Sequence, residues 1–188
     1  IDIINQVSDI PEAMISFATK SSDIDPFIKH IKNPQMCRVR LSMMPEHHRQ
    51  VLELNTARIE DRLTAINKLV DAGFEVHINL SPIVVTENIK EEYSNLLNLI
   101  NESLSNRAKS QLAYEIIFLT HSPTLYDKVP QYAPKAHDMM VNGPLQLVPK
   151  WNKPNVFSYG KKDKNTLKSL INSLVNNITP YSRIRYMF

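Results

Sequence analysis

The stretch Ala57–Ser81, with the sequence ARIEDRLTAINKLVDAGFEVHINLS, decides the fold. Its first part, Ala57–Ala72, repeats apolar residues three and four positions apart, as an amphipathic helix does. Gly73 follows, at the place where helices commonly end on a glycine. Phe74–Ser81 then alternates apolar and polar residues, which is the period of a β-strand. This order of helix, glycine and strand predicts one repeating unit of an α/β protein.

The same pattern continues on both sides of this stretch. Strand-like runs separated by helix-length connections cannot form hairpins, so we expect parallel strands joined by right-handed crossovers. The predicted strands are Ala13–Lys20, Cys37–Met43, Phe74–Ser81, Leu112–Leu119 and Arg183–Phe188. The predicted helices are Ile24–Ile31, Ala57–Ala72, Ile89–Leu104 and Asn165–Ile178.

The segment from His121 to Lys162 has a different character. Repeated prolines and little hydrophobic periodicity predict an irregular excursion before the C-terminal helix and strand. We therefore divide the chain into residues 1–120, which contain the βα units, and residues 121–188. The second part is expected to be an irregular extension whose terminal helix packs on the sheet.

Composition limits the possible functions. The 188 residues are 43% hydrophobic and 22% charged, with a net charge of +3, as in ordinary globular proteins. Three glycines leave no room for a glycine-rich phosphate loop or a dinucleotide fingerprint. The single cysteine, Cys37, excludes an internal disulfide and suits a reducing compartment, so we expect a cytoplasmic protein with no membrane segment. The start without Met or a secretory signal suggests part of a longer chain.

Polar residues alternate along strands that a parallel sheet would normally bury on both faces. Two interpretations remain open: an open sheet with one face in water, or a barrel whose polar face surrounds a hydrophilic ligand. Ligands of such folds bind at the carboxyl ends of the strands. Lys20, Ser42 and Ser81 each occupy such an end, which favours the second interpretation.

The chain resembles the spore photoproduct lyase family at these residues. The similarity runs in order along the sequence and is looser between His121 and Pro149. It rests on Phe17–Lys20 (FATK), Ser22–Asp25 (SDID), Arg38–Ser42 (RVRLS), Asn55-Thr56, Arg62, Ala72–Phe74 (AGF), Ser81–Ile83 (SPI), Tyr114–Ile116 (YEI), Lys150-Trp151 and Ile184–Tyr186 (IRY).

This resemblance implies a radical S-adenosylmethionine enzyme, in which this α/β chain forms the C-terminal portion of a partial (β/α)6 TIM-like barrel. A reduced [4Fe-4S] cluster would cleave S-adenosylmethionine to a 5′-deoxyadenosyl radical that abstracts a hydrogen atom from the substrate. The family's cluster motif, CxxxCxxC, is missing here, so the chain alone is expected to be inactive. By position, Lys20, Ser42 and Ser81 are the expected contacts to S-adenosylmethionine.

The resemblance also implies DNA or another nucleic acid as the partner and DNA repair as the activity. Trp151, Lys153 and Tyr159 are the candidate substrate-binding residues. The family has an Arg-Tyr pair after the Lys-Trp motif, whereas this chain has Lys153-Pro154. A proline offers no hydroxyl, and Tyr159 lies too far along to replace it by spacing. We therefore expect related radical chemistry on a substrate that need not be the thymine dimer.

Two alternatives remain. The chain could be a non-catalytic nucleic-acid-binding barrel domain, because its lysines and aromatic residues after residue 128 also suit single strands. It could also be an unrelated TIM-barrel lyase or hydrolase, with Lys20 as a Schiff-base lysine.

Two further groups of ionisable residues have structural interpretations. Neighbouring helix positions point about 100° apart, and no carboxylate or cysteine completes a ligand set. We therefore predict that His47 and His48 are surface residues and that the chain has no metal site. Glu115 lies in a strand and needs a partner if it is buried, for which Arg38 or Arg40 is expected.

Overall fold

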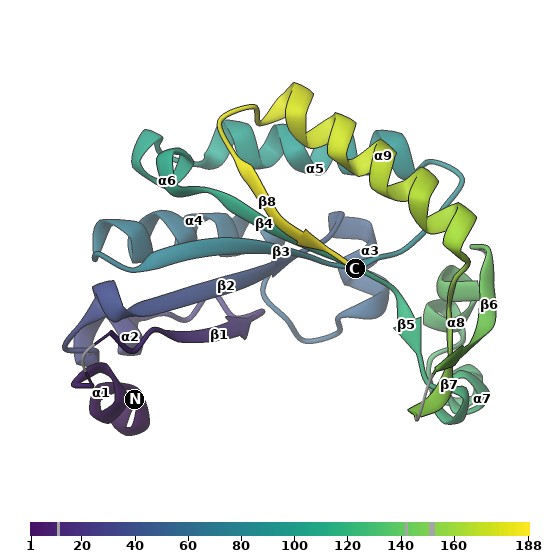
Figure 1. Ribbon diagram of the computed structural model, residues 1–188, viewed down its shortest axis with the longest axis horizontal. Helices are drawn as coiled ribbons and strands as arrows, with labels where there is room; N and C mark the ends of the chain where they lie inside the picture. Colours follow the sequence, from purple (N-terminus) through teal and green to yellow (C-terminus); the bar gives the residue numbers. More distant parts are fainter. Residues whose placement is uncertain (11, 142, 151–152) are drawn as a thin grey trace.

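The computed structural model describes residues 1–10, 12–141, 143–150 and 153–188. At its centre is a sheet of parallel strands that follow one another in chain order (Figure 1). The order is β1 (Ile15–Thr19), β2 (Cys37–Met43), β3 (Glu75–Ile83), β4 (Ala113–Phe118) and β8 (Arg183–Met187). Because each crossover is right-handed, an order without reversals places the connecting helices on one face.

The helices follow this rule. Figure 1 shows α4 (Ile59–Asp71), α5 (Ile89–Ser103) and α9 (Lys161–Ile178) along the same face of the sheet. The remaining helical elements of the parallel unit lie at strand ends and edges. They are α1 (Asp2–Ser8), α2 (Asp25–His30), the 3₁₀ turn η1 (Pro34–Met36), α3 (Glu46–Leu52) and α6 (Asn106–Gln111).

The core lies between the sheet and these helices. Alternate strand residues such as Leu41, Ile78 and Ile116 are fully buried on this face. The helices contribute their apolar stripes, including Ile66 and Ile171, to the same cluster. The alternation in the sequence therefore marks an apolar face against the helices and a polar face on the other side.

Gly73 ends α4 as the sequence predicts. Its φ of +93° lies in the left-handed region, which glycine adopts without a steric penalty. The amide of Gly73 donates to the carbonyl of Val70, and the amide of Phe74 donates to that of Leu69, both at 3.0 Å. This Schellman motif satisfies the last carbonyls of the helix and turns the chain directly into β3.

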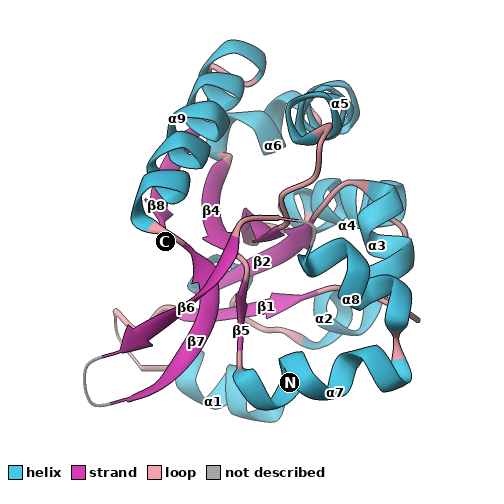
Figure 2. Cartoon of the chain, turned by 90° about the vertical axis from the view of Figure 1, so that its right-hand side faces the viewer, coloured by secondary structure: helices cyan, strands magenta, loops and turns pink. Residues whose placement is uncertain are grey.

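The prediction of an irregular segment from His121 to Lys162 is wrong. The described part of this segment forms α7 (Pro123–Tyr132), α8 (Pro134–Val141) and an antiparallel sheet (Figure 2). That sheet has the order β5 (Thr120–His121), β7 (Lys153–Tyr159) and β6 (Leu145–Lys150).

Several of the prolines misled the prediction because they occupy positions that tolerate them, although Pro130 lies inside α7. Pro123 and Pro134 are the first residues of their helices, where no amide donor is needed. The Ser122 hydroxyl also caps α7 by accepting a hydrogen bond from the Leu125 amide at 3.2 Å. Pro149 lies in β6, an edge strand of the small sheet.

After this excursion the chain returns to the parallel sheet. Helix α9 packs beside α5, and β8 pairs with β4. The predicted α/β class with parallel strands is therefore confirmed. The partial barrel stays a prediction, as does the division of the chain at residue 120. No helix in the described ranges is long and apolar enough to cross a membrane.

We predict that Ile171→Ala lowers the free energy of unfolding by about 3 kcal/mol, because it leaves a cavity where α9 meets the core. Asn172→Ala, on the exposed side of the same helix, should change it by less than about 0.5 kcal/mol. Urea unfolding of both variants measures the difference. Equal effects would show that α9 does not belong to the common core.

Candidate functional site

The face of the parallel sheet opposite the helices is polar. In the strand register, Arg40 lies beside His77, and Ser42 lies beside Asn79, which in turn lies beside Glu115. Rows of polar side chains therefore cross from β2 to β4.

Glu115 is fully buried on this face and is surrounded by donors. Its carboxylate lies 3.1 Å from Arg40 Nη1 and 2.5 Å from Arg185 Nη1, and it accepts a hydrogen bond from the Tyr186 hydroxyl. Burial alone would raise the pKa of Glu115, but the hydrogen bonds from Tyr186 and Arg40 and the nearby charges lower it. The predicted partner Arg40 is confirmed, although it reaches across β3 from β2.

A second group of charges continues the polar face towards the amino ends of the strands. Arg38 Nη2 lies 2.9 Å from Glu75 Oε2, and His77 Nε2 lies 2.8 Å from Glu75 Oε1. His77 is fully buried, and its desolvation lowers the pKa of the imidazole. The charges on this face are therefore paired and fixed before any ligand arrives.

The structure places Lys20 and Ser42 next to each other and connects them. Thr19 is in register with Leu41, so Lys20 follows β1 beside Ser42 of β2. Lys20 Nζ lies 2.7 Å from Glu53 Oε1, and Glu53 Oε2 lies 2.9 Å from Arg62 Nη2. Arg62 is fully buried and donates through Nη1 to the Ser42 carbonyl at 2.7 Å. One ion-pair chain therefore fixes the ends of both strands.

Asn79 and Ser81 extend this group onto β3. Asn79 is only 5% exposed, and its Oδ1 has no hydrogen-bond partner among the described residues. Ser81 lies two residues further along β3, where the register with β4 shifts, and its peptide bond to Pro82 is cis. The three predicted cofactor contacts thus lie at the carboxyl ends of three adjacent strands. Their role as contacts stays a prediction.

The predicted substrate residues are dispersed. Trp151 lies outside the described residues. Lys153 begins β7, with its backbone opposite Lys150. Tyr159 is 2% exposed, and burial raises the pKa of its hydroxyl to about 12. This hydroxyl accepts a hydrogen bond from the Val85 amide at 3.0 Å, so Tyr159 also stabilises the backbone that follows β3.

A cavity of about 530 Å³ lies between the small sheet and the start of α9. Lys161, Lys164 and Lys168 line it together with Tyr159. Partial burial, with Lys150 and Lys168 nearby, lowers the pKa of Lys164, which reflects a concentration of positive charge. This lysine cavity is therefore suited to attract an anion.

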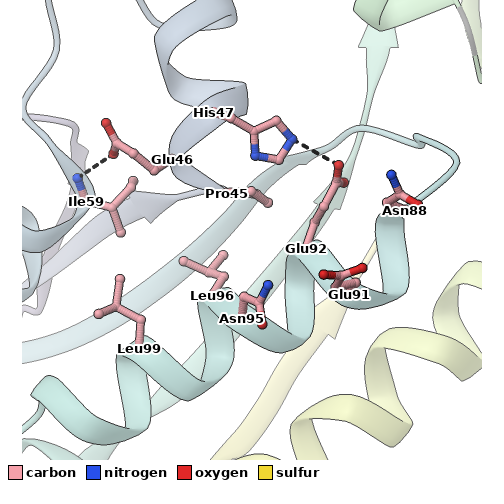
Figure 3. A pocket seen from close by; sticks show the side chains of 10 residues that line it. All are labelled: Pro45, Glu46, His47, Ile59, Asn88, Glu91, Glu92, Asn95, Leu96 and Leu99. Carbon is pink, nitrogen blue, oxygen red and sulfur yellow. Dashed lines mark hydrogen bonds and ion pairs between the residues drawn. The ribbon is translucent and has the colours of Figure 1, made fainter.

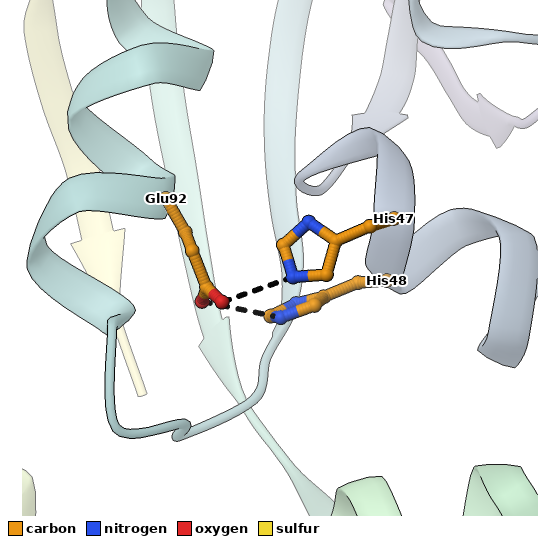
Figure 4. A group of neighbouring side chains, drawn as sticks. All are labelled: His47, His48 and Glu92. Atoms are coloured by element: carbon orange, nitrogen blue, oxygen red, sulfur yellow. Dashed lines mark hydrogen bonds and ion pairs between the residues drawn. The ribbon is translucent and has the colours of Figure 1, made fainter.

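The prediction that His47 and His48 are both surface residues is wrong for His48. His47 is exposed, but His48 is fully buried, and burial lowers the pKa of its imidazole to about 4. Both rings point towards Glu92 of α5 (Figure 4). Glu92 also supplies the carboxylate that the sequence analysis did not find for these histidines, because α3 and α5 meet only in the folded chain.

Sequence reasoning also missed residues that arrange the site. Glu53 directly follows α3 and Arg62 lies in α4, and nothing in their spacing indicates an ion pair between them. The alternating sequence places Asn79 on the polar face of its strand. It does not predict that Asn79 Oδ1 lacks a hydrogen-bond donor among the described residues. Arg185 and Tyr186 approach Glu115 only because β8 adds to the sheet beside β4.

Comparisons with known proteins agree with this architecture. A family model described as spore photoproduct lyase matches residues 2–188. Spore photoproduct lyase of Clostridium acetobutylicum is 24% identical over 167 residues, which cover 88% of this chain and 47% of that protein. The Bacillus subtilis enzyme is 20% identical over 174 residues, which cover 92% and 50%. The chain thus spans about half the length of these curated relatives.

Solved structures show the same fold. A spore photoproduct lyase mutant with bound AdoMet and dinucleoside spore photoproduct superposes with a TM-score of 0.90 at 18% identity. The match covers 100% of this chain and 55% of that one. Another mutant of spore photoproduct lyase gives a TM-score of 0.85 at 16% identity. At this level of identity the likeness establishes the fold.

We predict that Glu115→Gln lowers the free energy of unfolding at neutral pH by about 2 kcal/mol, because two arginines lose their buried counter-charge. A fully buried pair would cost more, but both guanidinium groups are partly exposed. Urea unfolding of the variant and the original chain measures the change.

The pH dependence provides the control. A carboxylate with a lowered pKa stabilises the fold above its unfolded pKa of about 4.3. That stabilisation is lost as the pH falls from about 5 through the folded pKa. The original chain should therefore lose more stability than Glu115→Gln over this interval. Parallel losses would contradict the role assigned to Glu115.

Proposed function

The chain belongs to the spore photoproduct lyase family, and we propose that it is the later part of a radical S-adenosylmethionine enzyme with a partial (β/α)6 barrel that acts on nucleic acid. The single observation that supports this best is the polar group at the carboxyl ends of β1, β2 and β3. Lys20, Ser42, Asn79 and Ser81 form this group, which we call the carboxyl-end cluster.

The carboxyl-end cluster fits S-adenosylmethionine by its chemistry. Lys20 offers an ammonium group for the carboxylate of the methionine part. The buried Oδ1 of Asn79 lacks a donor among the described residues, and the ribose hydroxyls and adenine amino group are donors. Ser42 and Ser81 add hydroxyl groups near the carboxyl ends of β2 and β3. A buried acceptor without a partner is costly, so a ligand that supplies a donor gains that energy.

An iron–sulfur cluster does not fit the residues of this chain. Cys37 is the only cysteine, is fully buried, and begins β2 at the end opposite Ser42. A [4Fe-4S] cluster needs several thiolates close together. In our proposal another segment of the protein binds the cluster.

The residues of this chain would hold and orient the reactants. Bound here and given one electron by the reduced cluster on another segment, S-adenosylmethionine would supply the 5′-deoxyadenosyl radical for hydrogen abstraction. Glu53 and Arg62 fix the position of Lys20 and of the Ser42 backbone. The paired charges around Glu115 keep the polar face ordered, so little reorganisation is needed when the ligand binds.

A nucleic-acid substrate is supported by the lysine cavity. Lys161, Lys164 and Lys168 can neutralise phosphates, and this attraction does not depend on sequence. The solved relative named above binds a dinucleoside spore photoproduct. Lys153-Pro154 stands where the family has its Arg-Tyr pair. We therefore propose a nucleic-acid lesion or modified base as the substrate and do not assign the thymine dimer.

A non-catalytic nucleic-acid-binding protein is the second candidate. The lysine cavity would serve such a protein equally well, since phosphate binding requires no radical chemistry. The unpartnered Asn79 in the carboxyl-end cluster favours the enzyme, because binding at the lysines leaves that acceptor unsatisfied.

The decisive test is anaerobic reconstitution of the full-length protein with iron and sulfide. We expect the reduced protein to convert S-adenosylmethionine to 5′-deoxyadenosine, measured by liquid chromatography. In the same protein, Lys20→Met should weaken S-adenosylmethionine binding at least tenfold, because a charge-assisted contact of roughly 1.5–3 kcal/mol is lost.

The matched control is Lys29→Met, which removes an exposed lysine from α2 and should leave binding unchanged. Circular dichroism establishes that both variants fold. A fully clustered and reduced protein that yields no 5′-deoxyadenosine would disprove the enzymatic proposal. Unchanged binding by a folded Lys20→Met variant would disprove only the assignment of Lys20.

Nucleic-acid binding tests the lysine cavity separately. Lys164→Gln should weaken binding of a single-stranded oligonucleotide and reduce the slope of log affinity against log salt by about 1. Lys29→Gln, on the far side of the sheet, should leave the slope as it is. Fluorescence anisotropy across a series of salt concentrations measures both. Identical slopes would remove the cavity from the binding surface.

A further inference from the structure

His47 and His48 of α3 and Glu92 of α5 form a compact group that the proposed function does not use. Their potential ligand atoms all lie within 4.8 Å of one another. His47 Nε2 lies 2.9 Å from Glu92 Oε1, and His48 Nε2 lies 3.3 Å from Glu92 Oε2. Figure 4 shows the two rings approaching the same carboxylate from one helix. We call this group the His-His-Glu cluster.

His48 is the unusual member of the cluster. Its side chain is fully buried, yet neither ring nitrogen has a well-formed hydrogen bond within the described part of the chain. A buried polar group without a partner costs free energy, and natural structures usually satisfy such groups with a ligand, water or ion.

Glu92 is held in place by a further contact. The Thr86 hydroxyl donates to Glu92 Oε2 at 2.5 Å. Carboxylates that bind metals are commonly oriented by such a second hydrogen bond. Thr86 precedes α5 in the chain, so the loop after β3 fixes the carboxylate while α3 supplies the two imidazoles.

Cavities adjoin the cluster and give it access to solvent. One of about 360 Å³ lies between α3 and α5 (Figure 3), and another of about 510 Å³ extends towards Met139 of α8. His47 and Glu92 line both of them. Glu46 and Glu91 also line the first; Glu46 is paired with Arg49, so Glu91 is the additional carboxylate that can attract a cation.

We propose that His47, His48 and Glu92 bind one divalent transition-metal ion, with Zn²⁺ as the reference ion. Two imidazole nitrogens and one carboxylate are a ligand set that zinc accepts in four-coordinate sites, with the remaining position open to water. The short separations between the ligand atoms require only small side-chain adjustments around an ion. Mg²⁺ prefers oxygen ligands alone and is excluded by this set.

The ion would join two parts of the fold. Helix α3 follows β2, and α5 follows β3, so a shared ion would link the chain segments that leave two neighbouring strands. Zinc binding should therefore raise the melting temperature, because the ion binds the folded state only. This inference is independent of the proposed radical chemistry.

The test is equilibrium dialysis of the full chain, under anaerobic conditions, against buffer with a fixed free Zn²⁺ concentration. Bound zinc per chain is then measured by mass spectrometry. We expect the original protein to hold one more zinc ion than His47→Gln or Glu92→Gln. Addition of excess Mg²⁺ should leave this difference intact.

The choice of variants keeps the result interpretable. His48 is buried, so its replacement could disturb folding, whereas His47 has a half-exposed side chain and can be changed safely. His30→Gln, which removes an exposed histidine from α2, is the matched control and should retain the zinc. Equal zinc in the original protein and in either His47→Gln or Glu92→Gln overturns the proposal, as does a zinc-induced rise in melting temperature that survives in them.

Discussion

A carboxylate buried in the middle of a parallel sheet is the constraint on which this structure depends. Glu115 cannot remain charged on its face of the sheet without donors, because burial of an isolated carboxylate is very costly. Glu115 lies in β4. Its donors come from β2, which lies beyond β3 on one side, and from β8, which pairs with β4 on the other side. Satisfying one charge therefore fixes the relative positions of strands that are far apart in sequence.

A second buried network, of ion pairs and a hydrogen bond, lies at the carboxyl ends of the strands. Glu53 binds a half-exposed lysine with one oxygen and a fully buried arginine with the other. The arginine also holds the backbone at Ser42. Removing the arginine would leave Glu53 buried with a single partner, so the geometry of Lys20 depends on a residue that never faces the site.

Much of the fold was predictable, because hydrophobic periodicity is local. The helix before Gly73 and the strand after it were found, as were the strand around Glu115 and the C-terminal helix. The prolines that begin α7 and α8 were misjudged, because a proline in the first turn of a helix does not break it. The His-His-Glu cluster and the Glu53–Arg62 pair were missed, since each joins residues from separate elements. Only the folded chain brings them together.

The place of β8 has a consequence for how the protein is made. This strand pairs with β4 after an intervening sequence that includes α7, α8 and α9. During synthesis, β4 therefore emerges before Arg185, which neutralises Glu115, and Tyr186, which donates a hydrogen bond to it. Until β8 is added, Glu115 has Arg40 as a partner but lacks Arg185, and β4 presents an open edge, an arrangement that favours aggregation. Pairing of β8 with β4 therefore extends the sheet and completes the set of donors around Glu115.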